Sequence, residues 1–503
     1  MLRRAFKQPP LLRRMSTVII TENTKPPADK VLQDISNYVH KYEITSPLAI
    51  STAKLCLLDT IGCGLAALKY DQPRNLIKPT VPGTIVPNGA KVPGTDLQQD
   101  PIRAAFSIGT LIRWLDYNDC WLAAEWGHPS DNLGGILAVA DYLTRAFKAG
   151  SSEGKVFKVR DLLEGMIKAH EIQGVLALEN SFNKVGLDHV ALVKIATTAV
   201  TSKMLGLNYD QTIDALSHAL ADGQSLRTYR HAPNTMSRKS WAAGDAVSRA
   251  VNLVYHVKNG EGGMPSILTA KTWGFYDVLF KGQKFKFQRD YGEYVMENVL
   301  FKISYPAEFH AQTAVEAAHK GFNTLAKSGK TYKDIKSIKI RTQNAAMRII
   351  DKKGPLHNYA DRDHCIQYMV AIPLIYGRLT ADDYSDSIAS DPEIDELRFK
   401  MVCVEDEQFT IDYHDPSKRY IGNALTIELK DGTVLDEIVV EFPVGHRKRR
   451  DEGKPLLLEK FQRHVKKQFV DESKVQHILK ECYKDDFEQM DVDEFVDLFI
   501  PSK

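Results

Sequence analysis

The sequence contains little cysteine, and the cysteines that it has are scattered. Only six occur in 503 residues, and none forms a Cys-x-x-Cys pair or a Cys/His cluster at zinc or iron-sulfur spacing. This pattern argues against a disulfide framework and favours a reducing compartment with free thiols. We therefore expect neither a metal nor any other cofactor.

The sequence also lacks a large excess of one charge. Its 66 Lys and Arg nearly balance 64 Asp and Glu, which leaves a formal net charge of +2. Proteins that bind nucleic acid usually carry a basic excess, because neutralised phosphates dominate their affinity, so no nucleic-acid partner is expected. Unbroken apolar runs such as 134–140 and 369–376 are much shorter than the roughly 18 to 20 residues that cross a bilayer, so no membrane partner is expected either.

The N-terminal segment is basic and contains no acidic residue before Glu22. Leucine and phenylalanine alternate with its basic residues, a composition typical of a mitochondrial transit peptide. We therefore predict a presequence over residues 1–25 and a location in the mitochondrial matrix. The alternative is a disordered basic tail. The basic residues are Arg3, Arg4, Lys7, Arg13 and Arg14.

Apolar residues recur at helical spacing from residue 30 to about residue 294, and they predict helices over 133–147, 159–178, 190–205 and 211–222. The pattern then changes. Isoleucines predict a short strand over 336–342, and two alternating segments, 424–430 and 433–442, flank Asp431-Gly432, a dipeptide that suits the tight turn of a β-hairpin. Helical spacing returns from Leu456 onward.

These patterns predict a protein that is mainly α with an α+β lid. A large all-helical domain, discontinuous in sequence, is expected to comprise residues 30–298 and 443–503. A smaller α+β domain is expected over residues 299–442. Because ligand sites often lie between such domains, the junction is the expected position of a site.

The segment 114–136 has an unusual density of polar and aromatic residues. Three of the five tryptophans lie in it, among Asp116, Cys120 and His128. Because a helix is predicted from residue 133, His128 is expected near a positively polarised helix N-terminus, where it can meet an anion. The alternative is an aromatic-packed connection whose acidic residues only cap helices.

A second candidate segment, 222–241, gathers cations between two predicted helices. Arginine offers bidentate recognition of carboxylates and lysine a compact charge, so this loop suits a polycarboxylate or phosphate ligand. The alternative is a solvated basic loop. No P-loop or dinucleotide-binding fingerprint accompanies it. The cations are Arg227, Arg230, His231, Arg238 and Lys239.

Two further segments, 301–313 and 361–368, place ionisable residues at the start of apolar helical runs, where they are expected to face the site from the lid. A single histidine such as His189 or His310 is more often structural than catalytic. Taken together, a site rich in cations, histidines and acids suits removal of a proton next to a carboxylate with loss of a hydroxyl, because the developing negative charge needs positive charge in place beforehand.

Three runs in the right order, 116–132 (DYNDCWLAAEWGHPSDN), 222–245 and 361–371, resemble the MmgE/PrpD family. The resemblance extends over about residues 30 to 500. It implies an enzyme without an iron-sulfur cluster, built from a helical domain and a smaller lid domain, and usually a homodimer. It further implies a hydro-lyase that dehydrates the tricarboxylate 2-methylcitrate to 2-methyl-cis-aconitate in the methylcitrate cycle of propionate catabolism.

Two alternatives remain open at this point. A decarboxylase acting on cis-aconitate would share the same site plan, although the long insertion before His128 resembles the dehydratase branch. A non-catalytic helical scaffold that only oligomerises is the other alternative.

The resemblance also implies roles for particular residues. Lys239, Arg230 and His231 are expected to bind the substrate carboxylates. One of Asp116, His128 or His189 is expected to remove the proton, and a second to protonate the departing hydroxyl. The implied catalytic residues are Asp116, His128, His189 and Lys239, and the implied substrate-binding residues are Cys120, Arg230, His231, His310 and Tyr368, with no metal ligand.

Overall fold

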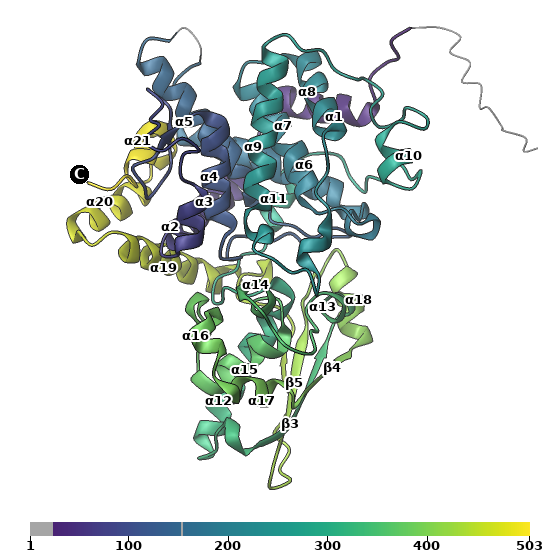
Figure 1. Cartoon of the computed structure of the whole chain (residues 1–503), viewed down its shortest axis with the longest axis vertical. Helices are drawn as coiled ribbons and strands as arrows, with labels where there is room; N and C mark the ends of the chain where they lie inside the picture. Colours follow the sequence, from purple (N-terminus) through teal and green to yellow (C-terminus); the bar gives the residue numbers. More distant parts are fainter. Residues whose placement is uncertain (1–23, 152–153, 503) are drawn as a thin grey trace, which may run out of the picture.

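The computed structural model of the chain describes residues 24–151 and 154–502 (Figure 1). In the view of Figure 1, a large helical body fills the upper part and a smaller α+β part lies beneath it. The chain is therefore mainly α with a smaller α+β part, which confirms the expected fold class. The presequence predicted for residues 1–25 lies outside the described residues, except for its last two positions.

Most of the helical body is formed by the N-terminal half of the chain. Four of its helices confirm the predicted ones to within two residues at each end. The helices are α1 (Lys30–Lys41), α2 (Pro47–Ala67), α3 (Asp71–Leu76), α4 (Pro101–Arg113), α5 (Leu133–Lys148), α6 (Val159–Glu179), α7 (Val190–Met204), α8 (Tyr209–Ala221), α9 (Arg238–Lys258), α10 (Phe275–Leu279) and α11 (Tyr294–Asn298), with 3-10 turns η1 (Pro129–Asn132) and η3 (Arg227–Arg230) and the short strand pair β1 (Ala90–Lys91) and β2 (Gln98–Gln99).

Helix α4 leads directly to the candidate site. The Asp100 side chain accepts hydrogen bonds from the backbone N–H groups of Ile102 and Arg103, both at 3.0 Å, and Pro101 occupies the first turn, where its missing N–H costs nothing. The helix ends at Arg113. Three residues later Asp116 adopts φ 48°, a left-handed conformation that turns the chain sharply after the helix.

Helix α2 is a core helix of the body. By length and composition alone it is apolar enough to cross a membrane, yet 78% of its most apolar window is buried inside the protein. The expectation that apolar segments are all much too short was therefore wrong for α2. Polar and charged residues such as Ser51, Lys54 and Asp59 interrupt its apolar residues, so no long unbroken run is visible in the sequence.

The C-terminal helices return to the body. Helix α19 (Arg450–Gln468) packs along α2 and is followed by α20 (Glu472–Cys482) and α21 (Val492–Asp497). Lys460 of α19 and Asp59 of α2, both almost completely buried, form an ion pair of 2.7 Å. Breaking a buried pair by removing one partner is strongly destabilising, so this contact ties the two distant segments together.

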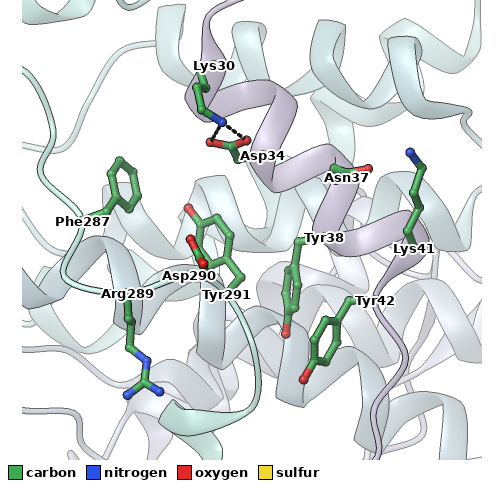
Figure 2. A pocket seen from close by; sticks show the side chains of 10 residues that line it. All are labelled: Lys30, Asp34, Asn37, Tyr38, Lys41, Tyr42, Phe287, Arg289, Asp290 and Tyr291. Carbon is green, nitrogen blue, oxygen red and sulfur yellow. Dashed lines mark hydrogen bonds and ion pairs between the residues drawn. The ribbon is translucent and has the colours of Figure 1, made fainter.

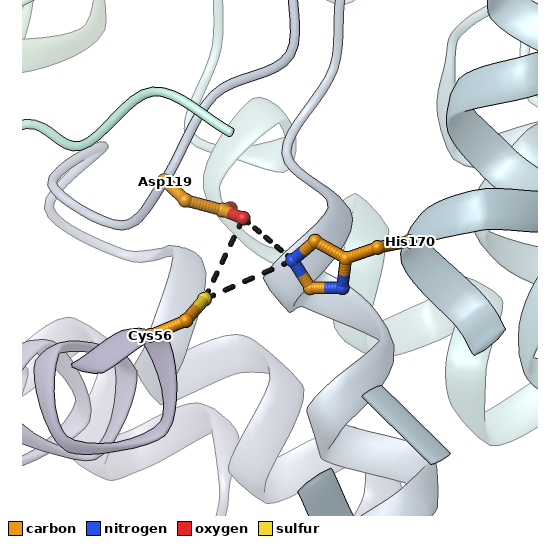
Figure 3. Close-up of side chains that lie close together, drawn as sticks. All are labelled: Cys56, Asp119 and His170. Atoms are coloured by element: carbon orange, nitrogen blue, oxygen red, sulfur yellow. Dashed lines mark hydrogen bonds and ion pairs between the residues drawn. The ribbon is translucent and has the colours of Figure 1, made fainter. Parts of the chain in front are cut away.

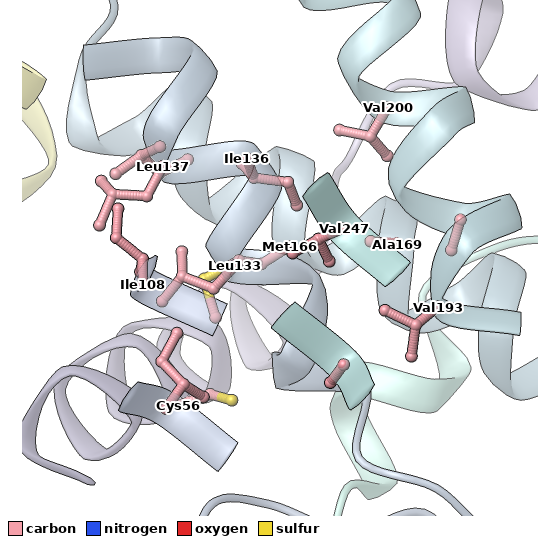
Figure 4. Close-up of a cluster of buried hydrophobic side chains, with 14 of the residues drawn as sticks. Cys56, Ile108, Leu133, Ile136, Leu137, Met166, Ala169, Val193, Val200 and Val247 are labelled. Atoms are coloured by element: carbon pink, nitrogen blue, oxygen red, sulfur yellow. The ribbon is translucent and has the colours of Figure 1, made fainter. Parts of the chain in front are cut away.

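The core of the body lies where α4, α5, α6, α7 and α9 meet, and Figure 4 shows buried aliphatic side chains from these helices. Glycines allow three of the helices to approach closely. A Cβ added to Gly109 would lie 2.9 Å from the Cα of Gly244, and one added to Gly134 would lie 2.8 Å from the Cα of Gly109. These contacts are with backbone, which cannot move aside cheaply.

Replacing Gly109 by alanine is expected to lower the free energy of unfolding by about 1–3 kcal/mol, the usual cost of overpacking a core. Chemical denaturation with circular dichroism measures it. Gly223→Ala is the matched control, because a Cβ there meets no atom within 4 Å. Equal stability of the two variants would show that α4 and α9 can separate without cost.

The α+β part consists of one four-stranded sheet and the helices around it. It comprises β3 (Ile335–Thr342), β4 (Met401–Glu405), β5 (Asn423–Leu429), β6 (Ile438–Val440), α12 (Gln312–Lys327), α13 (Asn344–Ile349), α14 (Tyr359–Arg362), α15 (Ile366–Tyr376), α16 (Asp386–Ala389), α17 (Pro392–Arg398) and α18 (Glu407–His414). Its core is a separate cluster of buried side chains from the sheet, α12 and α15.

The strand order is β4-β3-β5-β6, with β4 parallel to β3 and the other pairs antiparallel. The predicted strand 336–342 and the predicted hairpin are confirmed: β5 pairs with β6, and Gly432 adopts φ 89° in the connecting turn. The ladder is interrupted, because regular pairing is confined to Asn423–Leu425 against Ile438–Val440. Strand β4 was not predicted.

Candidate active site

A buried group of ionisable side chains lies where the helical body meets the α+β part. We call it the polar cluster. Each member is at most 6% exposed, an unusual burial for so many charged groups. Its members are Arg113, Asp116, His128, Asp188, His189, Arg230, Lys239, Lys302, Asp363 and His364.

Asp116 is at the centre of the polar cluster. Its carboxylate accepts a hydrogen bond from Arg113 Nη1 at 2.7 Å and is paired with Lys302, whose Nζ also donates to the Asp116 carbonyl at 2.8 Å. Burial opposes ionisation, but the charges of Arg113 and Lys302 outweigh it and hold the pKa of Asp116 well below its ordinary value. Asp116 is therefore a permanent carboxylate and a weak base.

The protonation state of His128 follows from its two hydrogen bonds. The Asp119 carbonyl, 2.6 Å from Nδ1, can only accept, so Nδ1 carries the proton. Arg113 Nη2 can only donate, and it lies 2.8 Å from Nε2, so Nε2 carries the lone pair. Burial and the neighbouring charge of Arg113 lower the pKa of His128 well below its ordinary value, which keeps the ring neutral.

His189 lies beside His128, with ring centroids 5.6 Å apart. Its Nδ1 is 3.4 Å from Asp188 Oδ1, while neither of its ring nitrogens has a hydrogen-bond partner among the described residues. Asp188 is held by Arg230, whose Nη2 donates at 3.2 Å. Burial lowers the pKa of His189 well below its ordinary value despite the nearby Asp188 carboxylate. The ring is thus neutral and lies beside the Asp188 carboxylate, and its nitrogens are available to bond a ligand.

Residues from the α+β part complete the polar cluster. Asp363 bonds Lys239 Nζ at 2.8 Å through one carboxylate oxygen and His364 Nδ1 at 2.8 Å through the other. His364 Nε2 reaches to 3.9 Å from Asp116 Oδ2. Burial lowers the pKa of Lys239, although Asp363 opposes this. These contacts link α9 of the body to the segment after α14.

A second layer adjoins the polar cluster at η3. Arg227 lies over the Trp126 ring at 4.9 Å, donates from Nε to His231 Nε2 at 3.2 Å, and approaches Glu125 to 3.6 Å. Burial raises the pKa of Glu125 to about 7, although Arg227 and Asn183 oppose this. Glu125 therefore changes its charge near neutral pH.

The raised pKa of Glu125 predicts a pH-dependent stability. An unfolded glutamate titrates near about 4.3, so between this pH and about 7 the folded chain binds more protons, and this group makes stability fall as pH rises. Replacing Glu125 by glutamine removes the effect. We expect the free energy of unfolding of the variant, relative to that of wild type, to rise by about 2–3 kcal/mol between about pH 5 and about pH 8, as measured by denaturant unfolding.

The control for this prediction is Glu261→Gln at an exposed position, for which the difference from wild type should stay flat over the same pH range. A flat difference for Glu125→Gln as well would show that Glu125 is ionised throughout.

The structure brings together Asp116, His128, His189, Lys239 and Arg230 among the predicted site residues. His231 lies at the exposed rim, next to Arg227. Arg230 has its guanidinium engaged by Asp188, so it is not a free carboxylate-binding group in this state.

The other predicted residues lie further out. Cys120 is 1% exposed, and burial raises the pKa of its thiol well above the ordinary value. His310 bonds Glu308 at 2.8 Å and the Tyr413 hydroxyl at 3.1 Å, and its ring contacts Trp126. The Tyr368 hydroxyl donates to the Asp383 carbonyl at 2.6 Å in the core of the α+β part. No hydrogen bond or ion pair joins these three to the polar cluster within residues 24–151 and 154–502, and their substrate-binding roles stay predictions.

Sequence reasoning did not assign five members of the polar cluster. Lys302 could have been found from the sequence, because a lysine inside the otherwise apolar run 299–303 indicates a buried cation. His364 and Asp363 fall in a run that was singled out without assigning them. The five are Arg113, Asp188, Lys302, Asp363 and His364.

Two groups of described residues have ligand atoms close enough to share a metal ion. One is Asp116, Asp363 and His364, whose two carboxylates are already neutralised by lysines. The other is Cys56, Asp119 and His170, shown in Figure 3. The expectation of a metal-free site stays a prediction.

Open clefts lie outside the polar cluster. One, of about 570 Å³, lies between α1 and the segment 287–291 (Figure 2), and polar groups on it such as Lys30 and Tyr38 already have protein partners. Another, of about 700 Å³, lies between the body and the α+β part and is lined by Tyr117, Asp382 and Arg463 among others. The members of the polar cluster are themselves buried, each at most 6% exposed.

Comparison with known proteins agrees with this architecture. The MmgE/PrpD N-terminal domain matches residues 33–288 and the MmgE/PrpD C-terminal domain residues 305–485. The chain is 72% identical to the 2-methylcitrate dehydratase, mitochondrial, of Yarrowia lipolytica, over 97% of this chain and 93% of that protein. It is 60% identical to the 2-methylcitrate dehydratase of Salmonella typhimurium, over 95% and 99%. The chain therefore belongs to the MmgE/PrpD family.

Proposed function

We infer that this chain is a hydro-lyase that dehydrates 2-methylcitrate to 2-methyl-cis-aconitate in the methylcitrate cycle. The reaction removes a proton from a carbon next to a carboxylate and expels the hydroxyl of the neighbouring carbon as water. One observation carries the inference: the buried polar cluster combines several cations with a neutral, unpartnered histidine, in a chain 60–72% identical to proteins that carry this name.

The cations of the polar cluster suit a tricarboxylate. In the closed state Lys239 and Lys302 are paired with Asp363 and Asp116, which occupy positions that substrate carboxylates would take. A substrate carboxylate can replace Asp363 at Lys239 if the α+β part moves. Arg230 then contributes by holding Asp188 and by adding positive charge, and buried Arg227 adds a further positive charge. Burial and the charge of Arg227 lower the pKa of His231, whose Nε2 accepts from Arg227, so His231 at the rim would meet a carboxylate as a neutral N–H donor.

We assign proton removal to His189. Asp116 is a weak base, because cations surround it, and the lone pair of His128 is occupied by Arg113. His189 is neutral and has no hydrogen-bond partner among the described residues, and Asp188 stands beside Nδ1 to stabilise the imidazolium that forms.

We assign protonation of the departing hydroxyl to Lys239. Neither Asp116 nor neutral His128 holds a proton that faces the site. Lys239 is an ammonium whose pKa is lowered by burial, which makes it a better acid than an exposed lysine. Once the proton has gone to the hydroxyl, which leaves as water, neutral Lys239 regains a proton from solvent when the site opens, and the His189 imidazolium releases the proton taken from carbon to solvent, so that both groups return to their starting states.

We propose that residues 299–442 form a lid over the helical domain formed by 30–298 and 443–503. Asp363 and His364 of this part cover Lys239 and Asp116. Closure keeps water from the reacting carbons and strengthens the electrostatic contacts within the site.

The test offers two substrates to purified, chelator-treated protein. With 2-methylcitrate, the absorbance of a conjugated alkene should rise, and mass analysis should show loss of water without loss of CO2. No reaction with 2-methylcitrate, together with CO2 from cis-aconitate, would favour the decarboxylase alternative. No binding of either tricarboxylate would favour the scaffold.

We propose further that the chain forms a homodimer in the mitochondrial matrix and has neither a nucleic-acid nor a membrane partner. Large apolar side chains at 37–79% exposure, among them Met264, Trp273 and Val278, support a protein contact on that face of the body. Light scattering should give twice the 56.6 kDa of the chain. The Yarrowia lipolytica relative is named as mitochondrial, which supports the location.

A further inference from the structure

The orientation of His128 depends on the position of one backbone carbonyl. The Asp119 carbonyl accepts the Nδ1–H of His128 at 2.6 Å, and this bond directs the Nε2 lone pair toward Arg113 and the rest of the polar cluster. Asp119 lies in an irregular segment after α4, where one backbone bond holds the same peptide unit: the Cys120 N–H donates to the Leu300 carbonyl at 2.7 Å. The Asp119 side chain supplies a second anchor for this carbonyl.

Two nitrogen donors and one thiol hold the Asp119 side chain. His170 Nε2 lies 2.8 Å from Oδ2, and the Ser130 backbone N–H donates to Oδ1 at 3.1 Å (Figure 3 shows the first contact). The Cys56 thiol completes the surroundings at 3.7 Å from both Asp119 Oδ2 and His170 Nε2. Asp119 and His170 are completely buried.

His170 is itself rigidly placed. It lies in the middle of the 21-residue helix α6, and its Nδ1 is 2.8 Å from the Met166 carbonyl one turn earlier. A carbonyl can only accept, so Nδ1 carries a proton. Nε2 faces the Asp119 carboxylate, which also accepts, so one proton lies between the two groups. The contact is therefore either an imidazolium with a carboxylate or a neutral imidazole with a carboxylic acid. In both forms the hydrogen bond fixes the position of the Asp119 side chain.

We propose that His170 is a positioning residue: through Asp119 it fixes the ring orientation and the tautomer of His128. Within residues 24–151 and 154–502, no hydrogen bond or ion pair joins His170 to the polar cluster, so it acts only through this relay. The inference rests on the proposed function in one respect: the polar cluster, in which His128 holds Arg113 beside Asp116, surrounds the reacting groups. The relay itself is a property of the fold.

The experiment compares His170→Leu with His170→Gln. Glutamine keeps an N–H donor near the position of Nε2, whereas leucine removes it. We expect His170→Leu to lower kcat about 10- to 100-fold, the usual penalty for misplacing a group near the chemistry, with KM within about twofold. His170→Gln should recover most of the loss.

A second measurement does not depend on activity. Nitrogen-15 NMR of histidine-labelled protein, with the His128 signals assigned by their loss in His128→Asn, should show a neutral ring protonated at Nδ1 in wild type and in His170→Gln. In His170→Leu the ring should populate both tautomers. A lower folded fraction alone would reduce kcat without changing this pattern.

The outcomes distinguish the positioning role of His170 from the role of His128 in the proposed reaction. An unchanged tautomer in His170→Leu overturns the inference, whatever the activity. A changed tautomer with unchanged kcat supports the relay and instead contradicts a role for His128 in the proposed reaction.

If His170→Leu does not fold, because Asp119 is left as a buried unpaired charge, Asp119→Asn/His170→Leu removes that charge and provides the same comparison against Asp119→Asn. A stoichiometric metal in wild type that His170→Gln lacks would also overturn the inference, since Cys56, Asp119 and His170 would then bind a cation.

Discussion

Replacing His189 by glutamine is expected to lower kcat for dehydration of 2-methylcitrate by about 10²- to 10⁴-fold, the range that a positioned general base contributes. The ring of His189 has both nitrogens unpartnered among the described residues, stands beside Asp188, and is kept neutral by burial. Glutamine has similar length and polarity but cannot take the proton. Initial rates of alkene absorbance, with KM determined in parallel, measure the effect.

The control for this prediction is His256→Gln, at an exposed position on α9, which should keep wild-type kinetics. Because the substrate carboxylates are bound by other residues, KM of His189→Gln should change much less than kcat. A His189→Gln enzyme with kcat within about twofold of wild type would exclude His189 as the base and would return the role to His128 or Asp116.

Replacing Lys239 by methionine is expected to weaken substrate binding and turnover together. Truncating one partner of a buried charge pair costs about 2–5 kcal/mol, which corresponds to a loss of kcat/KM of about 30- to 5,000-fold. Lys239 is 1% exposed and bonds Asp363 across the junction of the two parts. Methionine fills the same volume without the charge. Steady-state kinetics for the rate and calorimetry for substrate affinity separate the two contributions.

Loss of Lys239 also leaves the buried Asp363 carboxylate with only His364 as a partner, which destabilises the closed form for reasons unrelated to the substrate. The double variant Lys239→Met/Asp363→Asn removes both charges. We expect it to remain folded and to have the same low kcat/KM as Lys239→Met. Lys271→Met at an exposed position is the surface control. Wild-type kcat/KM in Lys239→Met would contradict both roles that we assign to this residue.

Much of the fold was predictable because its signals are local. Helical spacing located α5, α6 and α7 to within one residue, and Asp431-Gly432 located the β5–β6 hairpin. Strand β4 was missed, because it pairs with β3 in parallel across a long crossover and has only five residues, which gives a weak period. The apolar character of α2 was missed because polar and charged residues such as Lys54 and Asp59 break its runs.

The site was partly predictable for a similar reason. Asp116, His128 and Lys239 lie in runs whose density of polar residues is visible in the sequence, and the family resemblance assigned them roles. The partners that fix their protonation could not be read from the sequence, because they come from distant segments: Lys302 reaches Asp116 across 186 positions, and Asp363 reaches Lys239 across 124.

The central claim is that 2-methylcitrate binds and reacts in the polar cluster between the two parts of the molecule. The most direct measurement is a crystal structure of His189→Gln soaked with 2-methylcitrate. We expect one carboxylate of the substrate to bond Lys239 in place of Asp363, a second to lie near Lys302, and the carbon that loses its proton to face residue 189. Substrate found only in the cleft beside Arg463, with no contact to Lys239 or to residue 189, would contradict it.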